Sequence, residues 1–385
     1  MAQKKKTKHI KLDERLKKRP EKKTNYDKIK ELEQELSTTK YNKRTQHHIG
    51  LVKARIANLK KKELARSASK GKKEGYSVRK TGDGTVIILG FPSVGKSTLL
   101  NSITNADSPI GTYDFTTLKV IPGIMNYKHA KIQILDVPGV VSGAASGRGR
   151  GKEVLTVIRN CDLVLILLDI NRLNEYKVLC KEVYEAGIRL NQEKPDVRIK
   201  KKARGGIQIG RTVHLPDLDD KTIKSILKEF SISNAEVLIR TKINADQFID
   251  CIEGNRKYLP GIIIVNKVDL ASPEQIVDAK KIFPNALFIC AKKQDYTDEL
   301  KERIYKGLKL ISIYLKEVGK KADLKIPLIM NKDCKIRDVC SKLHRDFITK
   351  FKYARVWGNS AKFDGQMLRL KHKLLDGDVV ELHLR

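Results

Sequence analysis

The chain lacks long apolar runs, paired cysteines and any surplus of acidic residues. Its longest apolar runs, Leu163–Leu168 and Ile262–Val265, are far shorter than the roughly 18 residues that a membrane span needs. The sequence opens on charged residues that no apolar region follows, so neither a secretory signal nor a membrane association is expected. Six scattered cysteines without a CxxC pair are typical of reduced thiols, and they make a structural zinc site an unfavourable interpretation. A cytoplasmic location is therefore the expectation.

Basic residues, in contrast, are abundant and unevenly placed. The 385 residues include 79 Lys and Arg against 45 Asp and Glu, a net charge of +34. Residues 1–80 hold 27 Lys and Arg against 9 Asp and Glu, so +18 of this charge lies on about a fifth of the chain. An apolar content of 40% is enough for folded cores. The composition therefore predicts a globular protein with a polyanionic partner, and nucleic acid is the favoured one.

The N-terminal region divides into an arm and two expected helices. Residues 1–23 lack apolar periodicity and are interpreted as a basic arm, whereas apolar residues recur at helical spacing over 26–36 and again over 49–59. We expect these helices to pack as a hairpin, with Ser37-Thr38-Thr39 capping the second. Their basic surface suits RNA phosphates. A merely solubilising tail is the alternative.

Short apolar runs alternate with helical patterns beyond residue 82. The runs 86–89, 132–135, 163–168, 262–265 and 286–289 predict strands, and 151–159, 174–186, 273–282 and 296–307 predict helices. Such alternation indicates a parallel sheet covered on both faces. A basic segment interrupts it, so 187–240 is interpreted as an inserted subdomain with a helix near 219–229. We expect three parts: 1–82 (arm, hairpin and linker), 83–308, and 309–385.

A glycine-rich turn follows the first of these strands and matches GxxxxGK[ST]. Two glycines let backbone N–H groups point at phosphate oxygens, and the following helix adds its positive end. Lys96 is expected to place its charge between the β- and γ-phosphates, and the Ser97 hydroxyl to ligate Mg²⁺. The predicted phosphate-binding residues are Gly90, Phe91, Pro92, Ser93, Val94, Gly95, Lys96, Ser97 and Thr98.

Three further motifs follow in the order that a nucleotide switch requires. Asp136-Val137-Pro138-Gly139 ends a strand, with Asp136 suited to the second shell of Mg²⁺ and the Gly139 N–H to a γ-phosphate contact. Asn266-Lys267-Val268-Asp269 ends another strand. The Asp269 carboxylate can accept two hydrogen bonds from guanine, which adenine cannot donate. Cys290-Ala291-Lys292 follows the last strand, where a backbone N–H can reach the guanine O6.

Two loops are candidates for a response to the nucleotide. Thr116 and Thr117 precede the strand that leads to Asp136, and either hydroxyl could join Ser97 on Mg²⁺. The glycine-rich segment 139–151 has the composition of a loop that orders on a triphosphate.

Taken together, these residues resemble a known family. GFPSVGKST, YDFTTLKVIPG, DVPGVVSGAASGRGRGKEV and NKVD are similar to the Obg-like GTPases, and within them to the developmentally regulated GTP-binding (DRG) group of archaeal type. The resemblance implies an α/β P-loop GTPase fold with an N-terminal helical hairpin, an inserted α+β subdomain and a C-terminal β-grasp TGS domain. It also implies GTP hydrolysis with Mg²⁺ on the ribosome in translation, and it favours Thr117 as the magnesium ligand.

Two positions depart from related patterns. Ras-like proteins place a water-orienting Gln where this chain has Val140, so slow intrinsic hydrolysis is expected, with Lys96, Thr117 and Gly139 as the catalytic residues. Ser93 stands where many Obg relatives carry an Asn that helps hold K⁺, so stimulation by K⁺ stays open. A stabilising or activating protein partner also stays open, and a monomer is expected.

Three other functions compete with a GTP-driven switch. An ATPase of the TGS-bearing Obg relatives is disfavoured by Asp269. An RNA-binding module in which GTP is structural fits the same motifs and differs only in turnover. A metal-dependent nuclease would need an acidic or histidine cluster, and the adjacent His47 and His48 would point to different faces of a helix.

Overall fold

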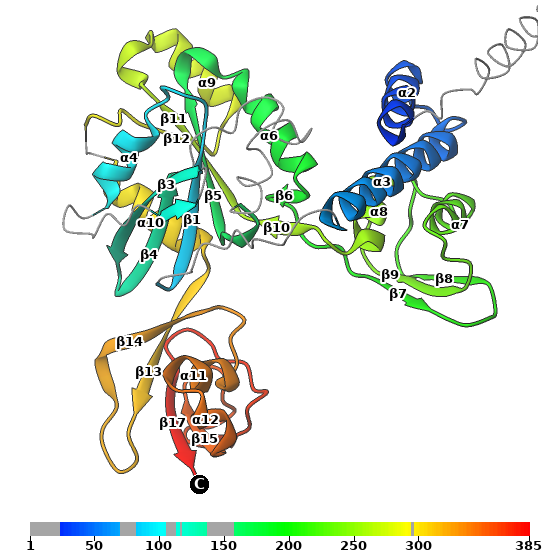
Figure 1. Ribbon diagram of the computed structural model, residues 1–385. Helices are drawn as coiled ribbons and strands as arrows, with labels where there is room; N and C mark the ends of the chain where they lie inside the picture. Colours follow the sequence, from blue (N-terminus) through cyan, green and yellow to red (C-terminus); the bar gives the residue numbers. More distant parts are fainter. Residues whose placement is uncertain (1–23, 70–81, 105–112, 116–117, 137–157, 294–295) are drawn as a thin grey trace, which may run out of the picture. The chain divides into compact units, whose positions relative to one another are not determined.

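The computed structural model describes residues 24–69, 82–104, 113–115, 118–136, 158–293 and 296–385 (Figure 1). Two compact units divide this part of the chain. Residues 24–69 and 194–256 form one, called here the insertion unit. The main unit holds 82–193 and 257–385 as far as they are described.

A seven-stranded sheet organises the first part of the main unit, in the order β12-β11-β5-β1-β4-β3-β2. The parallel strands are β1 (Gly84–Leu89), β4 (Ala130–Asp136), β5 (Leu163–Asp169), β11 (Gly261–Asn266) and β12 (Leu287–Phe288). Two strands at one edge, β3 (Leu118–Tyr127) and β2 (Tyr113–Phe115), run antiparallel. All five apolar runs singled out in the sequence thus belong to the parallel strands, as predicted.

Helices cover both faces of this sheet (Figure 1). Ile87 and Leu89 of β1 pack in one core with α6 (Glu175–Glu185) and α9 (Pro273–Ile282). Their neighbours Val86 and Ile88 point the other way, into a core shared with α4 (Lys96–Ile103) and α10 (Thr297–Gly307). Because alternate residues of a strand face opposite sides, a strand buried on both sides must be mostly apolar, as β1 and β5 are apart from Thr85 and Asp169.

Three of the four predicted helices in this part agree closely with α6, α9 and α10. The boundary of α9 is set locally: Ser272 accepts a hydrogen bond from the Gln275 N–H and Pro273 occupies the first turn. The helix expected over 151–159 lies mostly outside the described residues. Short elements complete the part: β6 (Ile188–Leu190) pairs with β10 (Lys257–Leu259), and the 3₁₀ turns η1 (Ile170–Arg172) and η2 (Val268–Leu270) follow β5 and β11.

The C-terminal part of the main unit is a second sheet, in the order β14-β13-β17-β15-β16. Its strands are β13 (Leu310–Lys316), β14 (Asp323–Asn331), β15 (Phe351–Trp357), β16 (Gln366–Leu368) and β17 (Val379–Leu384). Helix α11 (Ile336–Leu343) buries Val339 and Cys340 in the core on one face, and α12 (Asp346–Thr349) follows it. Lys342 of α11 forms an ion pair of 2.6 Å with Asp83, which directly precedes β1 of the first sheet.

The insertion unit combines segments that are far apart in the sequence. A three-stranded sheet of β7 (Val197–Lys201), β9 (Ala235–Ile239) and β8 (Ile207–Arg211) packs with α7 (Asp220–Glu229) and α8 (Ala245–Glu253). The N-terminal α3 (Gln46–Ser69) completes this core with Ala54, and its Ile49, Val52 and Ile56 are buried. Helix α3 is therefore an integral part of the insertion's core, whereas α2 buries no residue.

The hairpin was predicted correctly, but the cap was not. Ser37 and Thr38 lie in the last turn of α2 (Asn25–Thr38), and Thr39 ends it, whereas α3 begins only at Gln46. Their hydroxyls donate back to the carbonyls of Gln34 and Glu35 instead of accepting from a following helix. Short hydroxyl side chains serve either end of a helix, so their presence between two periodic segments does not decide which one they cap.

Among the described residues, no helix combines the length and apolar character needed to cross a membrane. All six cysteines are described, and none forms a disulfide.

Candidate nucleotide-binding site

The candidate site lies where parallel strands of the first sheet end. The phosphate loop follows β1, Asp136 is the last residue of β4, Asp169 of β5 and Asn266 of β11. Since neighbouring parallel strands end at the same edge, these polar residues meet there, which is the usual place for a ligand in an open α/β sheet. The motifs recognised along the sequence are thus brought to one edge.

The phosphate loop has the backbone that its glycines permit. Gly95 has φ +97°, and a Cβ there would lie 2.5 Å from Asn266 Nδ2; a Cβ on Gly90 would lie 2.6 Å from the Leu167 carbonyl oxygen. Ser93 also has a positive φ, 63°. Phe91 packs against both cores and Val94 is buried, whereas Pro92 and Ser93 are exposed. Only glycine fits at the two tight positions without displacing backbone or a buried side chain.

Lys96 lies at the end of this loop and turns back over it. Its Nζ donates to the carbonyl oxygens of Gly90 at 3.1 Å and Phe91 at 2.9 Å. Burial lowers the pKa of Lys96, against an opposing effect of the Asp136 carboxylate. A partly desolvated ammonium held by two loop carbonyls is ready to exchange these partners for phosphate oxygens.

Ser97 and Asp136 form the part of the site that could hold a metal ion. The Ser97 hydroxyl donates to Asp136 Oδ2 at 2.8 Å, and Asp136 is buried at the end of β4. Its other oxygen, Oδ1, is buried and has no hydrogen-bond partner among the described residues. Buried polar atoms are normally satisfied, so a carboxylate oxygen without a partner among the described residues, beside a hydroxyl, fits a cation ligand. Both are hard oxygen donors, which suit Mg²⁺.

Asn266 connects two motifs of the site. Its Nδ2 donates to the Val94 carbonyl at 2.7 Å, and its Oδ1 accepts from the Ala291 N–H at 2.9 Å. Asn266 is 2% exposed. One buried amide thus joins the phosphate loop to the turn Cys290-Ala291-Lys292.

Lys267 has a partner that the sequence interpretation missed. Its Nζ lies 2.8 Å from Asp169 Oδ2. Burial raises the pKa of Asp169, but the hydrogen bonds from Lys267 and from the Asn171 N–H outweigh it, so the pKa is lowered overall. The carboxylate holds the lysine stem beside the site. The sequence does contain a signal for this residue, because Asp169 is the polar residue that directly follows the apolar run Leu163–Leu168.

Asp269 and Cys290 form the base-recognition end. Asp269 is exposed, and the Cys290 thiol donates a hydrogen bond to it, which is the largest cause of the lowered pKa of this carboxyl. Cys290 and Ala291 are buried, and Lys292 is exposed. An ionised, accessible carboxylate fits a pair of N–H donors such as those of guanine.

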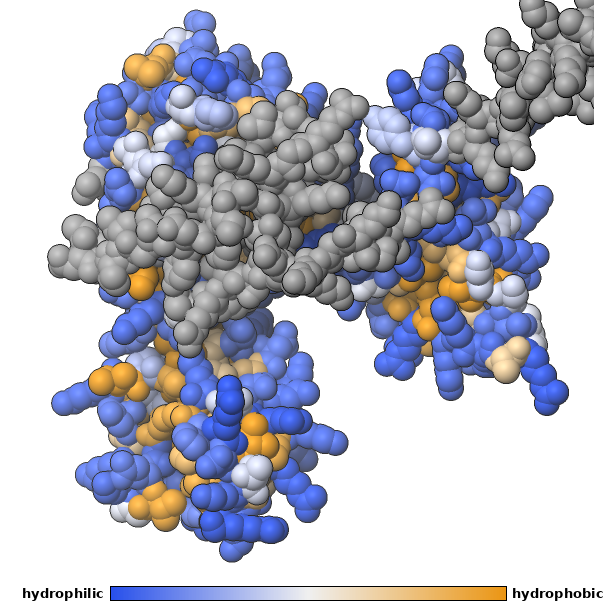
Figure 2. Space-filling view, viewed as in Figure 1, coloured by the Kyte–Doolittle hydropathy of each residue, from blue (hydrophilic) through white to orange (hydrophobic). Residues whose placement is uncertain are grey.

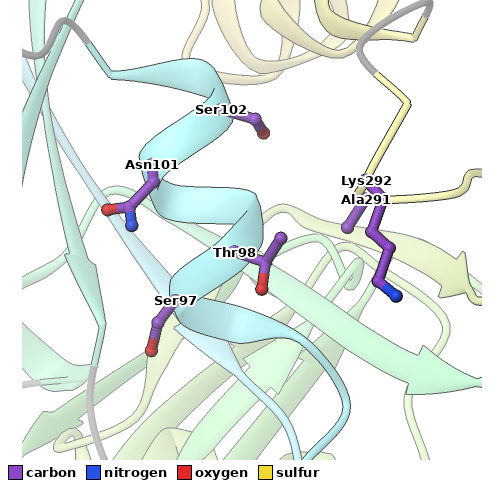
Figure 3. A pocket seen from close by; sticks show the side chains of 6 residues that line it. All are labelled: Ser97, Thr98, Asn101, Ser102, Ala291 and Lys292. Carbon is purple, nitrogen blue, oxygen red and sulfur yellow. The ribbon is translucent and has the colours of Figure 1, made fainter.

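A hollow of about 440 Å³ adjoins this end of the site. It is lined by Ser97, Thr98, Asn101 and Ser102 of α4 and by Ala291 and Lys292. Figure 3 shows Thr98 and Ser102 projecting from α4 toward the side on which Ala291 and Lys292 lie. Polar groups from the two motifs thus face one space.

Several predicted residues lie outside the described part of the chain. These are Thr116 and Thr117, Gly139, Val140 and the glycine-rich segment 139–151. His47 and His48 are described and contact different elements: His47 Nδ1 lies 3.0 Å from the Thr222 hydroxyl of α7, and His48 Nε2 lies 2.9 Å from Glu35 of α2. They do not form a common site.

Three family models match consecutive parts of the chain. Residues 85–202 match a "50S ribosome-binding GTPase" model, 204–310 the "C-terminal region of MMR_HSR1 domain", and 311–384 the "TGS domain". A GTP-binding protein of Methanocaldococcus jannaschii is 49% identical over 363 residues, 93% of each chain. The chain belongs to the family of DRG-type GTP-binding proteins. The resemblance and fold class inferred from the motifs are confirmed.

Eukaryotic members of the DRG family are similar over nearly the same length. Developmentally-regulated GTP-binding protein 1 of Xenopus laevis is 41% identical over 358 residues, which are 92% of this chain and 97% of that one. Developmentally-regulated GTP-binding protein 2 of Homo sapiens is likewise 41% identical over 358 residues, 92% and 98% of the two chains. The chain is therefore a GTP-binding protein with a GTPase domain and a TGS domain, like the DRG proteins.

Proposed function

We propose that this protein hydrolyses GTP to GDP and phosphate with Mg²⁺, and that its nucleotide state controls binding to RNA of the ribosome during translation. One observation supports the proposed GTP hydrolysis. At the strand edge, the Ser97 hydroxyl donates a hydrogen bond to one carboxylate oxygen of Asp136. The second carboxylate oxygen of Asp136 is buried near Lys96 and has no partner among the described residues. Such an arrangement stabilises little by itself and is explained by a bound metal–nucleotide complex.

The residues of the loop would act by position and charge. Phosphoryl transfer needs little covalent help from a protein, and catalysis comes mainly from placing the phosphate and stabilising its developing charge. Lys96 and the N–H groups after Gly90 would hold the β- and γ-phosphates. Ser97, with Asp136 behind it, would hold Mg²⁺, which neutralises phosphate charge when bound. Thr117 and Gly139 are proposed as further catalytic contacts.

Hydrolysis is proposed to be slow in the isolated protein. The residue after Gly139 is Val140, whose side chain cannot orient a water molecule. Single-turnover hydrolysis, measured with and without Mg²⁺, K⁺ and ribosomes, tests this. We expect a Mg²⁺-dependent basal rate that ribosomes raise. Tight GTP binding without turnover under every condition would favour the alternative in which GTP is structural.

The proposed binding of ribosomal RNA is supported by basic residues of the insertion unit. Arg198, Lys200, Lys201 and Arg204 are exposed on β7 and the turn that follows, and the exposed Lys60, Lys61 and Lys62 extend along α3. Figure 2 shows mostly hydrophilic side chains on the visible face of this unit. The description of the matched family model, a 50S ribosome-binding GTPase, supports the same partner.

The experiment that tests RNA binding must leave the hydrophobic core of the insertion unit intact. Removing residues 1–80 would expose the apolar residues of the insertion that α3 covers, so weaker binding would be ambiguous. Removing only residues 1–23 deletes 11 Lys and Arg and 3 Asp and Glu and leaves both helices. A second variant replaces Arg198, Lys200, Lys201 and Arg204 by Gln. A control replaces Lys280 and Lys281 of α9, also exposed, by Gln.

We expect both test variants to bind ribosomes less tightly and to flatten the dependence of log affinity on log salt. The slope should fall by roughly 0.7–0.9 for each phosphate that a Lys or Arg no longer neutralises. The α9 control should keep the wild-type slope. Unchanged slopes in both test variants would contradict RNA binding by these residues and would favour the alternative in which their charge only increases solubility.

A further inference from the structure

The C-terminal sheet has two very different faces. Ile313, Ala354, Val356 and Val380 point toward the core that contains α11. Because alternate residues of a strand face opposite sides, their neighbours in sequence point the other way. That second face is named here the ring face. It carries aromatic rings and cations where the first carries aliphatic residues.

The strand register places the rings and cations of the ring face in rows. Tyr353 of β15 pairs with His383 of β17, and their rings stack with centroids 4.3 Å apart at an interplanar angle of 19°. In the next row, Glu381 of β17 lies between Lys316 of β13 and Arg355 of β15. Trp357 follows one row further, and the Lys316 Nζ lies 4.1 Å from its ring centroid.

Glu381 holds this arrangement together. It is 3% exposed, and it contacts Lys316 Nζ at 2.8 Å and His383 Nε2 at 2.6 Å. Burial raises the pKa of Glu381, but these two partners outweigh burial and lower it overall. A buried carboxylate therefore keeps a lysine and an imidazole beside the rings instead of letting them extend into solvent.

The charge around the ring face favours a polyanion. Residues 311–385 contain 17 Lys and Arg against 9 Asp and Glu, a net charge of +8. Tyr353, Arg355 and Trp357 keep part of their surface exposed, Lys352 beside Tyr353 is exposed, and the Met367 side chain opposite Arg355 is 59% exposed. Rings interleaved with cations on an open sheet suit unpaired bases and the phosphates that join them.

We propose that the ring face binds single-stranded nucleic acid, with bases stacking on the Tyr353–His383 pair and beside Trp357 and with phosphates contacting Arg355 and Lys352. It is separate from the nucleotide site and does not rest on the assignment of RNA to the insertion unit. Stacking is indifferent to sequence because every base has a flat face, so affinity without strong sequence preference is expected.

The chain offers a local probe, because Trp357 is its only tryptophan. The experiment titrates the full chain, saturated with GDP, with a short single-stranded RNA of mixed sequence and with DNA of the same sequence at low salt. We expect quenching of the Trp357 fluorescence, and the two arms tell which sugar is preferred. Inorganic polyphosphate, which has charge but no bases, should leave the fluorescence nearly unchanged.

Tyr353→Leu is the test variant, because leucine keeps apolar bulk on the strand and removes the ring. We expect roughly ten-fold weaker binding, equivalent to about 1.4 kcal/mol at 25 °C, with GTP hydrolysis unchanged. Tyr184→Leu is the matched control, since Tyr184 also pairs its ring with a cation, Arg189, but lies on α6. Its affinity should equal that of the wild type.

Arg355→Gln gives an independent measurement if Tyr353→Leu folds poorly. It should weaken binding and reduce the salt slope. The proposal is overturned if saturating RNA leaves the Trp357 fluorescence unchanged, or if polyphosphate quenches this fluorescence as strongly as RNA does. It is also overturned if Tyr353→Leu and Arg355→Gln both bind like Tyr184→Leu, or if an acidic peptide quenches and oligonucleotides do not.

Discussion

The nucleotide site and the surface of the insertion unit both suit anions, yet they are built in opposite ways. At the strand edge, the one loop lysine is half-buried and held by two carbonyls, and the residues around it are tied to one another by buried amides and carboxylates. On the insertion unit, the cations are exposed, several to a strand or helix. Of the net charge of +34, +18 lies on residues 1–80 and +8 on residues 311–385, so most of it lies away from the strand edge.

This difference separates recognition of one small anion from attraction of a large one. A triphosphate needs donors fixed at a few positions, so burial and backbone geometry matter more than the number of charges. A nucleic acid presents many equivalent phosphates, so exposed cations act additively and are screened by salt. The comparison predicts that single substitutions act strongly at the strand edge and weakly elsewhere.

Lys96→Ala should have the largest effect. It removes the ammonium from the phosphate loop, and we expect GTP hydrolysis to fall roughly 100- to 1,000-fold, as when one preorganised donor is removed, with weaker nucleotide binding as well. Lys280→Ala, an exposed lysine of α9, is the control and should keep the wild-type rate. A Lys96→Ala protein that hydrolyses GTP normally would show that the strand edge is not the active site.

Asp269→Asn should come next. The exposed carboxylate is expected to accept two hydrogen bonds from guanine, and an amide can accept only on one side. We expect GTP affinity to fall roughly 100-fold, since each charge-assisted bond contributes about 1.5–3 kcal/mol, while xanthosine triphosphate gains. Competition titrations with GTP, ATP and xanthosine triphosphate measure this. Asp278→Asn on α9 is the matched control, and equal GTP affinities for the two variants would contradict guanine recognition by Asp269.

Much of the strand edge could be predicted because its parts are local. The phosphate loop, the apolar strands and the ends of α9 each depend on residues within a few positions, such as the Ser272–Gln275 cap. Glycines at 90 and 95 are visible in the motif, and the structure shows the close contacts that require them. The order of these motifs along the chain was then enough to indicate the resemblance to the Obg-like GTPases.

The remaining features depend on contacts across long sequence distances. The partner of Lys267 is Asp169, 98 positions away, and Asn266 joins residues on two separate motifs. The packing of α3 against the insertion brings residue 54 beside residues near 223–249. The ring face depends on strand register, which no short motif encodes. Periodicity located the elements but could not say which of them meet.

Asn266→Ala tests the connection within the strand edge. It leaves the Val94 carbonyl and the Ala291 N–H buried without a partner, which should lower the free energy of unfolding by about 2–4 kcal/mol and speed nucleotide release. Asn234→Ala is the control: its amide also joins two backbone groups, at Gly206 and Ala203, but in an exposed place. Water can replace that amide, so denaturant unfolding should show a decrease below about 1 kcal/mol. Similar decreases in the two variants would mean that burial does not explain the role of Asn266.

The smallest effect is expected at Cys290, whose buried thiol contacts the exposed Asp269 carboxylate. The Cys290 S–H lowers the pKa of Asp269, so Cys290→Ala should let that pKa rise toward its ordinary value, whereas Cys290→Ser keeps a donor. Guanine binding needs the ionised carboxylate, which all three proteins have at neutral pH, so their GTP affinities should be similar there. The affinity of the Ala variant should fall first as pH drops toward about 4, where an ordinary aspartate is about half protonated. GTP titrations of wild type, Cys290→Ser and Cys290→Ala between neutral and acidic pH measure this. Parallel curves for the two variants would show that the thiol contributes only packing, and that the base-recognition end is set by Asp269 alone.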